Sequence, residues 1–253
     1  MTSALLVLML MFQQRSPVTT LIGVDQELGV HVDGGIPFRN EHGTRVTLGE
    51  FYGTRPIILV PVYYECPMLC SMQLNGLVAA MRVMPFTAGK EFDVVTFSID
   101  PNETPALALT KKDHYIHDYA RAGADRGWHF LTGDAEAIRR VTDAVGYRYT
   151  YDEPIRQWAH ASALIVLTPS GRVSQYFFGI EYDPSALKYS LIEASGGKIG
   201  SFIDHALLFC FKYDPTTGKY SVAIMRVLQI ASLATLLGLV MFIVYANRIS
   251  ALS

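Results

Sequence analysis

Several common signals of enzymatic function are missing from this chain. It has no Ser-His-Asp order of the kind found in hydrolases, no phosphate-binding P-loop and no GxGxxG motif, so hydrolase and nucleotide-binding functions are not indicated. Charge is also scarce, with a formal net charge of −2 and no stripe of basic residues interleaved with aromatic ones. The sequence therefore gives no reason to expect a nucleic-acid partner.

Cysteine is the next scarce residue. Three cysteines cannot form a disulfide scaffold. Cys210 lies in an aromatic-rich segment and is predicted to be a buried, inert thiol. The other two, Cys66 and Cys70, are four residues apart and carry most of the functional information in the chain.

Cys66 and Cys70 fall at a predicted junction between a strand and a helix. The apolar run Ile57–Tyr64 precedes them, and apolar residues recur at helical spacing over Met68–Met84. Backbone N–H groups and the helix dipole at such a junction favour thiolates, the form of cysteine that attacks disulfides and binds soft metals. Two sulfurs one helical turn apart could close a disulfide or bind Cu(I), so sulfur redox chemistry and metal chemistry both stay open.

A metal site would usually recruit a third ligand from elsewhere in the chain. His160 comes just before the predicted strand Ala163–Leu167, and would lie at the sheet end where Cys66 emerges if the two strands are parallel neighbours. Taken alone, a single histidine in such a place more often satisfies backbone groups. His114 and His117 have a spacing that can bind metal, but their charge-rich helix is more typical of a solvated face.

Two further residues have side chains that could bind a ligand. Met68 could approach Cu(I) through its thioether, but a helical methionine is more often a packing residue. Asp100 ends a predicted strand, and we expect it to cap the following helix.

The middle of the chain alternates strand-like and helix-like segments, which predicts an α/β fold with a mixed central sheet flanked by helices. A hairpin is expected around Thr44–Leu48, and a second one, with its turn at Thr168–Gly171, joins the last two strands. The expected strands are Ile57–Tyr64, Phe92–Ile99, Trp128–Leu131, Ala163–Leu167 and Arg172–Gly179, and the expected helices are Met68–Met84, Asn102–Ala120, Asp134–Gly146 and Pro184–Ala194.

Long apolar runs lie near both ends of the chain. Val227–Ala246 has twenty residues and no charge, which matches the length needed to cross the hydrocarbon core and predicts one C-terminal transmembrane helix. Ala4–Phe12 is too short to span and fits the apolar region of a signal peptide. The expected organisation is a signal segment, one α/β domain, a juxtamembrane connector, a transmembrane helix and a short tail, at residues 1–16, 17–215, 216–226, 227–246 and 247–253.

The segments Tyr63–Cys70 and Phe97–Pro105, with His160 ninety residues after Cys70, resemble the Sco/SenC family. The resemblance covers about residues 30–215. It implies a thioredoxin-like fold and copper, as Cu(I), Cu(II) or both, bound by the thiolates of Cys66 and Cys70 and by His160. It also implies a role in assembling the binuclear copper centre of cytochrome c oxidase.

The chain departs from many members of that family in two ways. Ser71 follows the second cysteine where many members have proline, and the clear membrane anchor is C-terminal. Both departures leave the implied ligand set intact and bear instead on the identity of the partner.

Three functional hypotheses follow from these observations. The first is a copper metallochaperone anchored in the cell (inner) membrane, with its main domain facing the periplasm or the outside. Its partner would be the copper-bearing subunit of cytochrome c oxidase or a similar cuproprotein. The second is a thiol–disulfide reductase in which Cys66 and Cys70 are catalytic and Cys66 attacks. The third, ranked last, is a redox or copper sensor. His160 distinguishes the first two hypotheses, because a purely redox dithiol does not need it.

Overall fold

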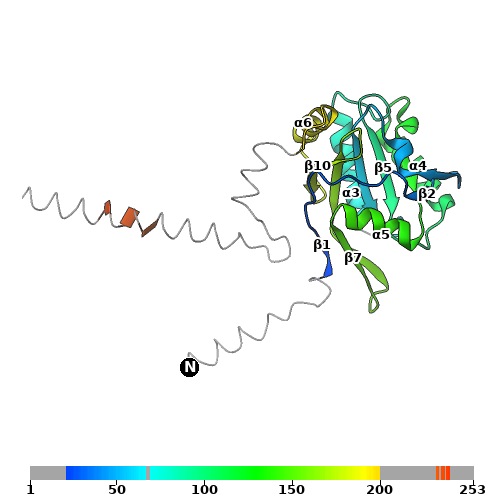
Figure 1. Ribbon diagram of the computed structural model, residues 1–253, viewed down its shortest axis with the longest axis horizontal. Helices are drawn as coiled ribbons and strands as arrows, with labels where there is room; N and C mark the ends of the chain where they lie inside the picture. Colours follow the sequence, from blue (N-terminus) through cyan, green and yellow to red (C-terminus); the bar gives the residue numbers. More distant parts are fainter. Residues whose placement is uncertain (1–20, 67–68, 200–231, 234, 237, 240–253) are drawn as a thin grey trace, which may run out of the picture. The chain divides into compact units, whose positions relative to one another are not determined.

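The computed structural model describes residues 21–66, 69–199, 232–233, 235–236 and 238–239, together with the side chains of these residues except those of Leu69 and Cys70. The chain divides into two compact units, Met1–Ser201 and Phe202–Ser253. The strands and helices of the first unit are shown in Figure 1. In order they are β1 Gly23–Val24, β2 Pro37–Arg39, β3 Arg45–Thr47, η1 Leu48–Phe51, β4 Ile57–Val62, α3 Leu69–Val83, β5 Asp93–Ser98, α4 Pro105–Tyr119, η2 Ala124–Arg126, β6 Trp128–Leu131, α5 Ala135–Ala144, β7 Tyr147–Asp152, β8 Gln157–His160, β9 Ala163–Leu167, β10 Val173–Phe178 and α6 Pro184–Ser195.

The main sheet has five strands in the order β10-β9-β4-β5-β6. β4, β5 and β6 are parallel, whereas β9 is antiparallel to both β4 and β10. Every residue of β4 and β5 is buried, as the near-continuous apolar runs of these strands require for a sheet covered on both faces. The predicted mixed sheet flanked by helices is thus confirmed.

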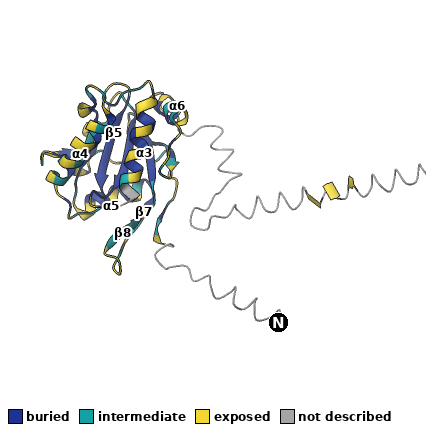
Figure 2. Cartoon of the chain, turned by 180° about the vertical axis from the view of Figure 1, so that it is seen from behind, coloured by how far each residue is buried: buried dark blue, intermediate teal, exposed yellow. Residues whose placement is uncertain are grey.

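Helices α3 and α4 connect successive parallel strands that step in one direction across the sheet. Right-handed crossovers place both helices on the same face, where they pack against each other. Helix α6 contacts α3 and the β9–β10 hairpin. Figure 2 shows the buried strands as the interior layer, while the helices keep exposed outer faces. The carboxyl ends of β4, β5 and β6 consequently share one edge of the sheet.

Both edges of the main sheet are covered by the segment that precedes β4. At the β10 edge, Gly29 donates its N–H to the carbonyl of Val173, and Val173 donates to the carbonyl of Val30. At the β6 edge, Arg39 and Thr132 exchange two backbone hydrogen bonds of 2.7 and 2.9 Å. The segment thus occupies one end of each edge strand, which hinders edge-to-edge association with another chain there.

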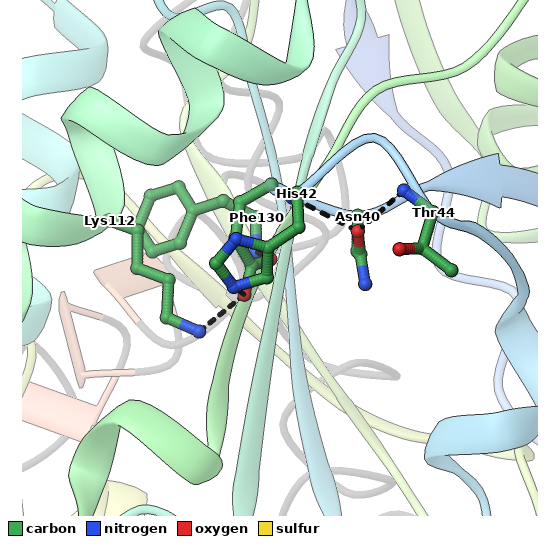
Figure 3. Close-up of polar contacts among 6 residues, drawn as sticks. Asn40, His42, Thr44, Lys112 and Phe130 are labelled. Carbon is green, nitrogen blue, oxygen red and sulfur yellow. Dashed lines mark hydrogen bonds and ion pairs between the residues drawn. The ribbon is translucent and has the colours of Figure 1, made fainter.

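A buried carboxylate completes the cover of the β6 edge. The side chain of Glu41 is 4% exposed; it accepts the N–H of Phe130 at 3.2 Å and forms an ion pair with Lys112 of α4. Figure 3 shows Lys112 reaching toward this carboxylate, and Asn40 bonded through its side chain to the backbone of His42 and Thr44. Glu41 therefore joins the loop, the edge strand and α4 at one point.

One hairpin in the structure was absent from the predictions. Strands β7 and β8 pair antiparallel, and β1 adds to β7 to make a second, three-stranded sheet. The hairpin extends away from the main sheet (Figures 1 and 2). Its signal was present in β7, where Tyr147, Tyr149 and Tyr151 alternate with polar residues at the two-residue period of a strand.

The membrane prediction receives no support from the described helices. Over residues 21–66 and 69–199 and the few described positions beyond them, no helix has the length and apolar character needed to cross a membrane. The predicted span 227–246 lies outside the described residues except at 232–233, 235–236 and 238–239. The predicted signal segment, connector and tail, together with Cys210, lie wholly outside them.

Candidate metal centre

The turn that carries Cys66 follows directly from the end of β4. The N–H of Cys66 donates to the carbonyl of Tyr63 at 3.3 Å, which folds the chain back toward the start of α3. Cys66 is buried, with 9% of its surface exposed. The first cysteine thus lies where the sequence predicts it, between a buried strand and a helix.

Cys70 lies in the first turn of α3, again as predicted, although its side chain is outside the described part of the structure. Gln73, one turn further along, fixes this helix end to the sheet. Its side-chain amide is fully buried and donates to the carbonyl of Ala163 at 2.9 Å. The start of α3 is therefore held against the start of β9, three residues after His160.

His160 reaches the same place, but through a different topology from the predicted one. Strands β4 and β9 are antiparallel, with Leu59 opposite Ile165, so the start of β9 lies beside the end of β4. Parallel strands would have put His160 at the opposite end of the sheet, and that part of the prediction is wrong. The imidazole packs edge-to-face against the ring of Tyr63 at a centroid distance of 5.9 Å.

Tyr63 therefore connects two of the three predicted ligands, since its carbonyl accepts from Cys66 and its ring contacts His160. The described side chains contain no group of three His, Cys, Asp or Glu residues placed to hold a metal ion. The thiol of Cys70 was not part of that search, because it lies outside the described residues. The three-ligand site remains a prediction.

Hydrogen bonds on the far side of His160 fix the orientation of its ring. Nδ1 lies 2.9 Å from the hydroxyl of Tyr147 and 2.8 Å from the carbonyl of Ala161, and the Tyr147 hydroxyl donates to that carbonyl at 2.6 Å. A carbonyl cannot donate, so the short contact requires the proton of the neutral imidazole to be on Nδ1. Nε2 is then the unprotonated ring nitrogen, the one whose chemistry suits metal binding.

Tyr147 is the contributor to this site that the sequence predictions missed. It is 2% exposed and belongs to β7, thirteen residues before His160. Supporting hydrogen bonds of this kind are common behind metal-binding histidines, because they set the tautomer and hold the ring. The strand period of β7 puts Tyr147 on the same face as Tyr149, the residue that pairs with His160.

Met68 lies outside the described residues, and the other candidates that the structure describes do not join this site. His114 and His117 are exposed, and each lies within 3.6 Å of a carboxylate oxygen of Asp118, as expected for a solvated helix face. Asp100 does not cap α4: the N-cap is Thr104, and the Asp100 carboxylate accepts the N–H of Asn102 instead. An aspartate two residues before another N–H readily forms this local turn, which competes with capping.

The donors collected here suit soft or borderline metal ions. Cysteine thiolates and an imidazole are the ligands preferred by copper, whereas hard ions prefer oxygen. The same two cysteines would also support disulfide exchange without His160. The residues therefore fit a bound copper ion and do not by themselves exclude redox chemistry.

Comparisons with known proteins agree with the fold and add a family. Among solved structures, a protein of Aquifex aeolicus VF5 assigned a role in electron transfer superposes with a TM-score of 0.59 at 26% identity, over 68% of this chain and 95% of that one. Arabidopsis thaliana ScoI, solved with copper bound, gives a TM-score of 0.52 at 20% identity, over 66% and 99%. No curated protein matches the chain.

A third solved structure is that of BsSco, described as a member of the Sco family of cytochrome c oxidase assembly proteins with a disulfide switch. It gives a TM-score of 0.53 at 20% identity, over 71% of this chain and 99% of that one. The sequence model of the SCO1/SenC family matches residues 26–193, which include the Cys66 turn, α3 and His160. The chain belongs to the SCO1/SenC family.

Proposed function

We propose that this protein is a copper metallochaperone that takes part in assembling a copper centre of cytochrome c oxidase or of a similar cuproprotein. Copper is its cargo, held by the thiolates of Cys66 and Cys70 and by Nε2 of His160. The observation that carries the proposal is the convergence of the Cys66 turn and His160 on Tyr63. Family membership and the copper bound to Arabidopsis ScoI support the choice of metal.

The proposed ligands suit both the binding and the release of the ion. Two thiolates and one imidazole favour Cu(I) over hard ions and leave its coordination number low. A site with few ligands can pass the ion on by exchanging its ligands one at a time for those of a partner. We also propose that the C-terminal span 227–246 anchors the domain to a membrane, with the domain on the periplasmic or outer side.

Thiol–disulfide exchange is the second candidate function, in which Cys66 attacks and Cys70 resolves the mixed disulfide. The Cys-x-x-x-Cys spacing at the start of α3 favours it, as does the disulfide switch described for BsSco. The two functions are compatible, because a disulfide between the copper-binding cysteines of a client would have to be reduced before metal could enter.

A copper titration of the full-length protein in detergent tests the first function. The reduced protein is titrated with Cu(I) and Cu(II) against a competing chelator, alongside the variants Cys66→Ser, Cys70→Ser and His160→Ala. We expect His160→Ala to weaken copper binding at least about 100-fold, the upper end of what losing only a supporting hydrogen bond costs. His117→Ala is the matched control, because His117 is exposed and lies on α4.

A disulfide-reduction assay on the same variants separates the two functions. Equal copper affinity in the wild type and in a Cys66→Ser/Cys70→Ser variant would show that the metallochaperone proposal is wrong. An unchanged copper affinity in His160→Ala, combined with disulfide exchange that needs both cysteines, would favour the reductase.

A further inference from the structure

A buried carboxylate holds the turn that carries Cys66. Glu103 lies in the loop between β5 and α4 and is 9% exposed. Its Oε2 accepts the N–H of Tyr64 at 2.8 Å and its Oε1 accepts the N–H of Glu65 at 2.7 Å. The hydroxyl of Ser98 donates to Oε2 at 2.5 Å. One side chain from the end of β5 therefore binds two consecutive backbone groups at the end of β4.

These two N–H groups come directly before Cys66. Strand β4 ends at Val62, so the N–H groups of Tyr64 and Glu65 lie beyond it and do not pair with a neighbouring strand. A donor left buried without a partner costs about 1–3 kcal/mol, and the Glu103 carboxylate supplies both missing acceptors. The backbone conformation of Tyr64 and Glu65, and with it the position of the Cys66 sulfur, depends on this carboxylate.

We propose that Glu103 is a positioning residue for Cys66: its carboxylate holds the Tyr64–Glu65 backbone and so fixes the thiol for reaction or metal binding. A carboxylate suits this role because each of its two oxygens accepts. A glutamine of the same size has one accepting oxygen, and its NH₂ group would face a backbone N–H as donor against donor. The consequence for copper rests on the proposed function, whereas the consequence for the thiol does not.

The sequence offers a matched control in Glu41, which is also a buried glutamate that accepts a backbone N–H. Its partners are Phe130 on the edge strand and Lys112 on α4, and no hydrogen bond among the described residues joins it to the Cys66 turn. Glu41→Gln thus removes a buried charge of the same chemistry from a different place. Because it leaves the Lys112 charge unpaired, Glu41→Gln should destabilise the protein more than Glu103→Gln. It therefore shows how much of any measured effect comes from a general loss of stability.

The experiment compares Glu103→Gln with Glu41→Gln in the full-length chain. The first measurement is the rate at which Cys66 is alkylated in metal-free protein, in a Cys70→Ser/Cys210→Ser background where it is the sole cysteine. A buried thiol reacts through local opening, so we expect Glu103→Gln to raise the rate about tenfold and Glu41→Gln to raise it less. The second, with all cysteines present, is the thiolate-to-Cu(II) absorption spectrum, which should shift in Glu103→Gln only.

Equal alkylation rates and equal spectra in the two variants would overturn the proposal, because the effect of Glu103 would then be a general loss of stability. If Glu103→Gln does not fold, Ser98→Ala removes one hydrogen bond from the same carboxylate. That variant should also alkylate faster than the wild type, and a wild-type rate would count against the proposal. A wild-type protein that binds no copper would refute the proposed function while leaving the alkylation comparison to decide the role of Glu103.

Discussion

Two glutamates of this protein are almost equally buried, yet their surroundings differ. Glu41 meets a cation, Lys112, whose side chain is 11% exposed. Among the described residues, the hydrogen-bond donors that Glu103 meets are neutral, namely two backbone N–H groups and the hydroxyl of Ser98. The first joins the loop before β4 to the edge strand β6, whereas the second joins the ends of β4 and β5 beside Cys66.

The difference appears in their pKa values. Burial works to raise the pKa of Glu41, but the hydrogen bond and charge of Lys112, together with hydrogen bonds from the backbone of Glu41 and Phe130, outweigh it and the pKa is lowered. Burial and, to a smaller extent, the nearby charge of Asp100 raise the pKa of Glu103, and the hydrogen bonds from Ser98, Tyr64 and Glu65 do not offset them. The buried carboxylate of Glu41, paired with a cation, thus stabilises the fold at neutral pH. The carboxylate of Glu103, held by neutral donors, keeps a desolvation cost, and a role in positioning the Cys66 turn would explain why it is buried there.

The largest expected effect comes from Glu41→Gln. Lys112 would be left as a buried charge without its partner, which costs about 3–5 kcal/mol of unfolding free energy. Urea denaturation of the full-length chain measures the change. Copper affinity per folded molecule should stay at the wild-type value, and a large loss of affinity would show that the two regions are coupled.

A second substitution at the partner should restore much of that loss. In Glu41→Gln/Lys112→Met no buried charge remains, and the amide oxygen of the glutamine can still accept from Phe130. We expect the double variant to lie within about 1–2 kcal/mol of the wild type. If instead the two single losses simply add, the ion pair does not account for the stabilising effect of Glu41.

The smallest effect is a difference in pH dependence between the two sites. The lowered pKa of Glu41 means that its stabilisation is present above the unfolded value near 4.5 and is lost as the pH falls through the folded value. The raised pKa of Glu103 means that its contribution is present below 4.5 and is lost as the pH rises through the folded value.

Unfolding free energies measured over this pH range test both signs. The destabilisation by Glu41→Gln should grow as the pH rises, and that by Glu103→Gln should shrink. Slopes of the same sign for both variants would contradict the contrast between the two carboxylates.

Most of the fold could be predicted because its elements have strong local signals. The apolar run of β4 and the helical spacing of α3 fix the positions of Cys66 and Cys70 without reference to the rest of the chain. Asp134 is the N-cap of α5, at the start the sequence indicated, whereas α4 begins three residues later than predicted, with Thr104 as its N-cap. The place of His160 before a predicted strand made it a candidate ligand, and the resemblance then favoured it over the more ordinary role of a single histidine.

What could not be predicted depends on contacts between distant segments. The direction of β9 relative to β4 is set by the pairing of the whole sheet, so the expected parallel arrangement was wrong although His160 still lies beside the Cys66 turn. The carboxylates of Glu41 and Glu103 act on backbone groups 89 and 39 residues away. A glutamate in a loop gives no local sign that it will be buried there, because its partners are known only once the chain has folded.

The antiparallel pairing of β4 with β9 also bears on the order of events during synthesis. Cys66 leaves the ribosome with its strand and helix long before β9 exists to bring His160 beside it. The two cysteines could thus be oxidised or capture an ion while the site is still incomplete. Because Cys66 and His160 are far apart in the sequence, the proposed ligands would meet only late in folding. Full coordination of an ion would then require a completed domain. If copper is bound as proposed, a loaded three-ligand centre would also be a mark that folding has finished, and the bound cargo would add its binding energy to the stability of the native state.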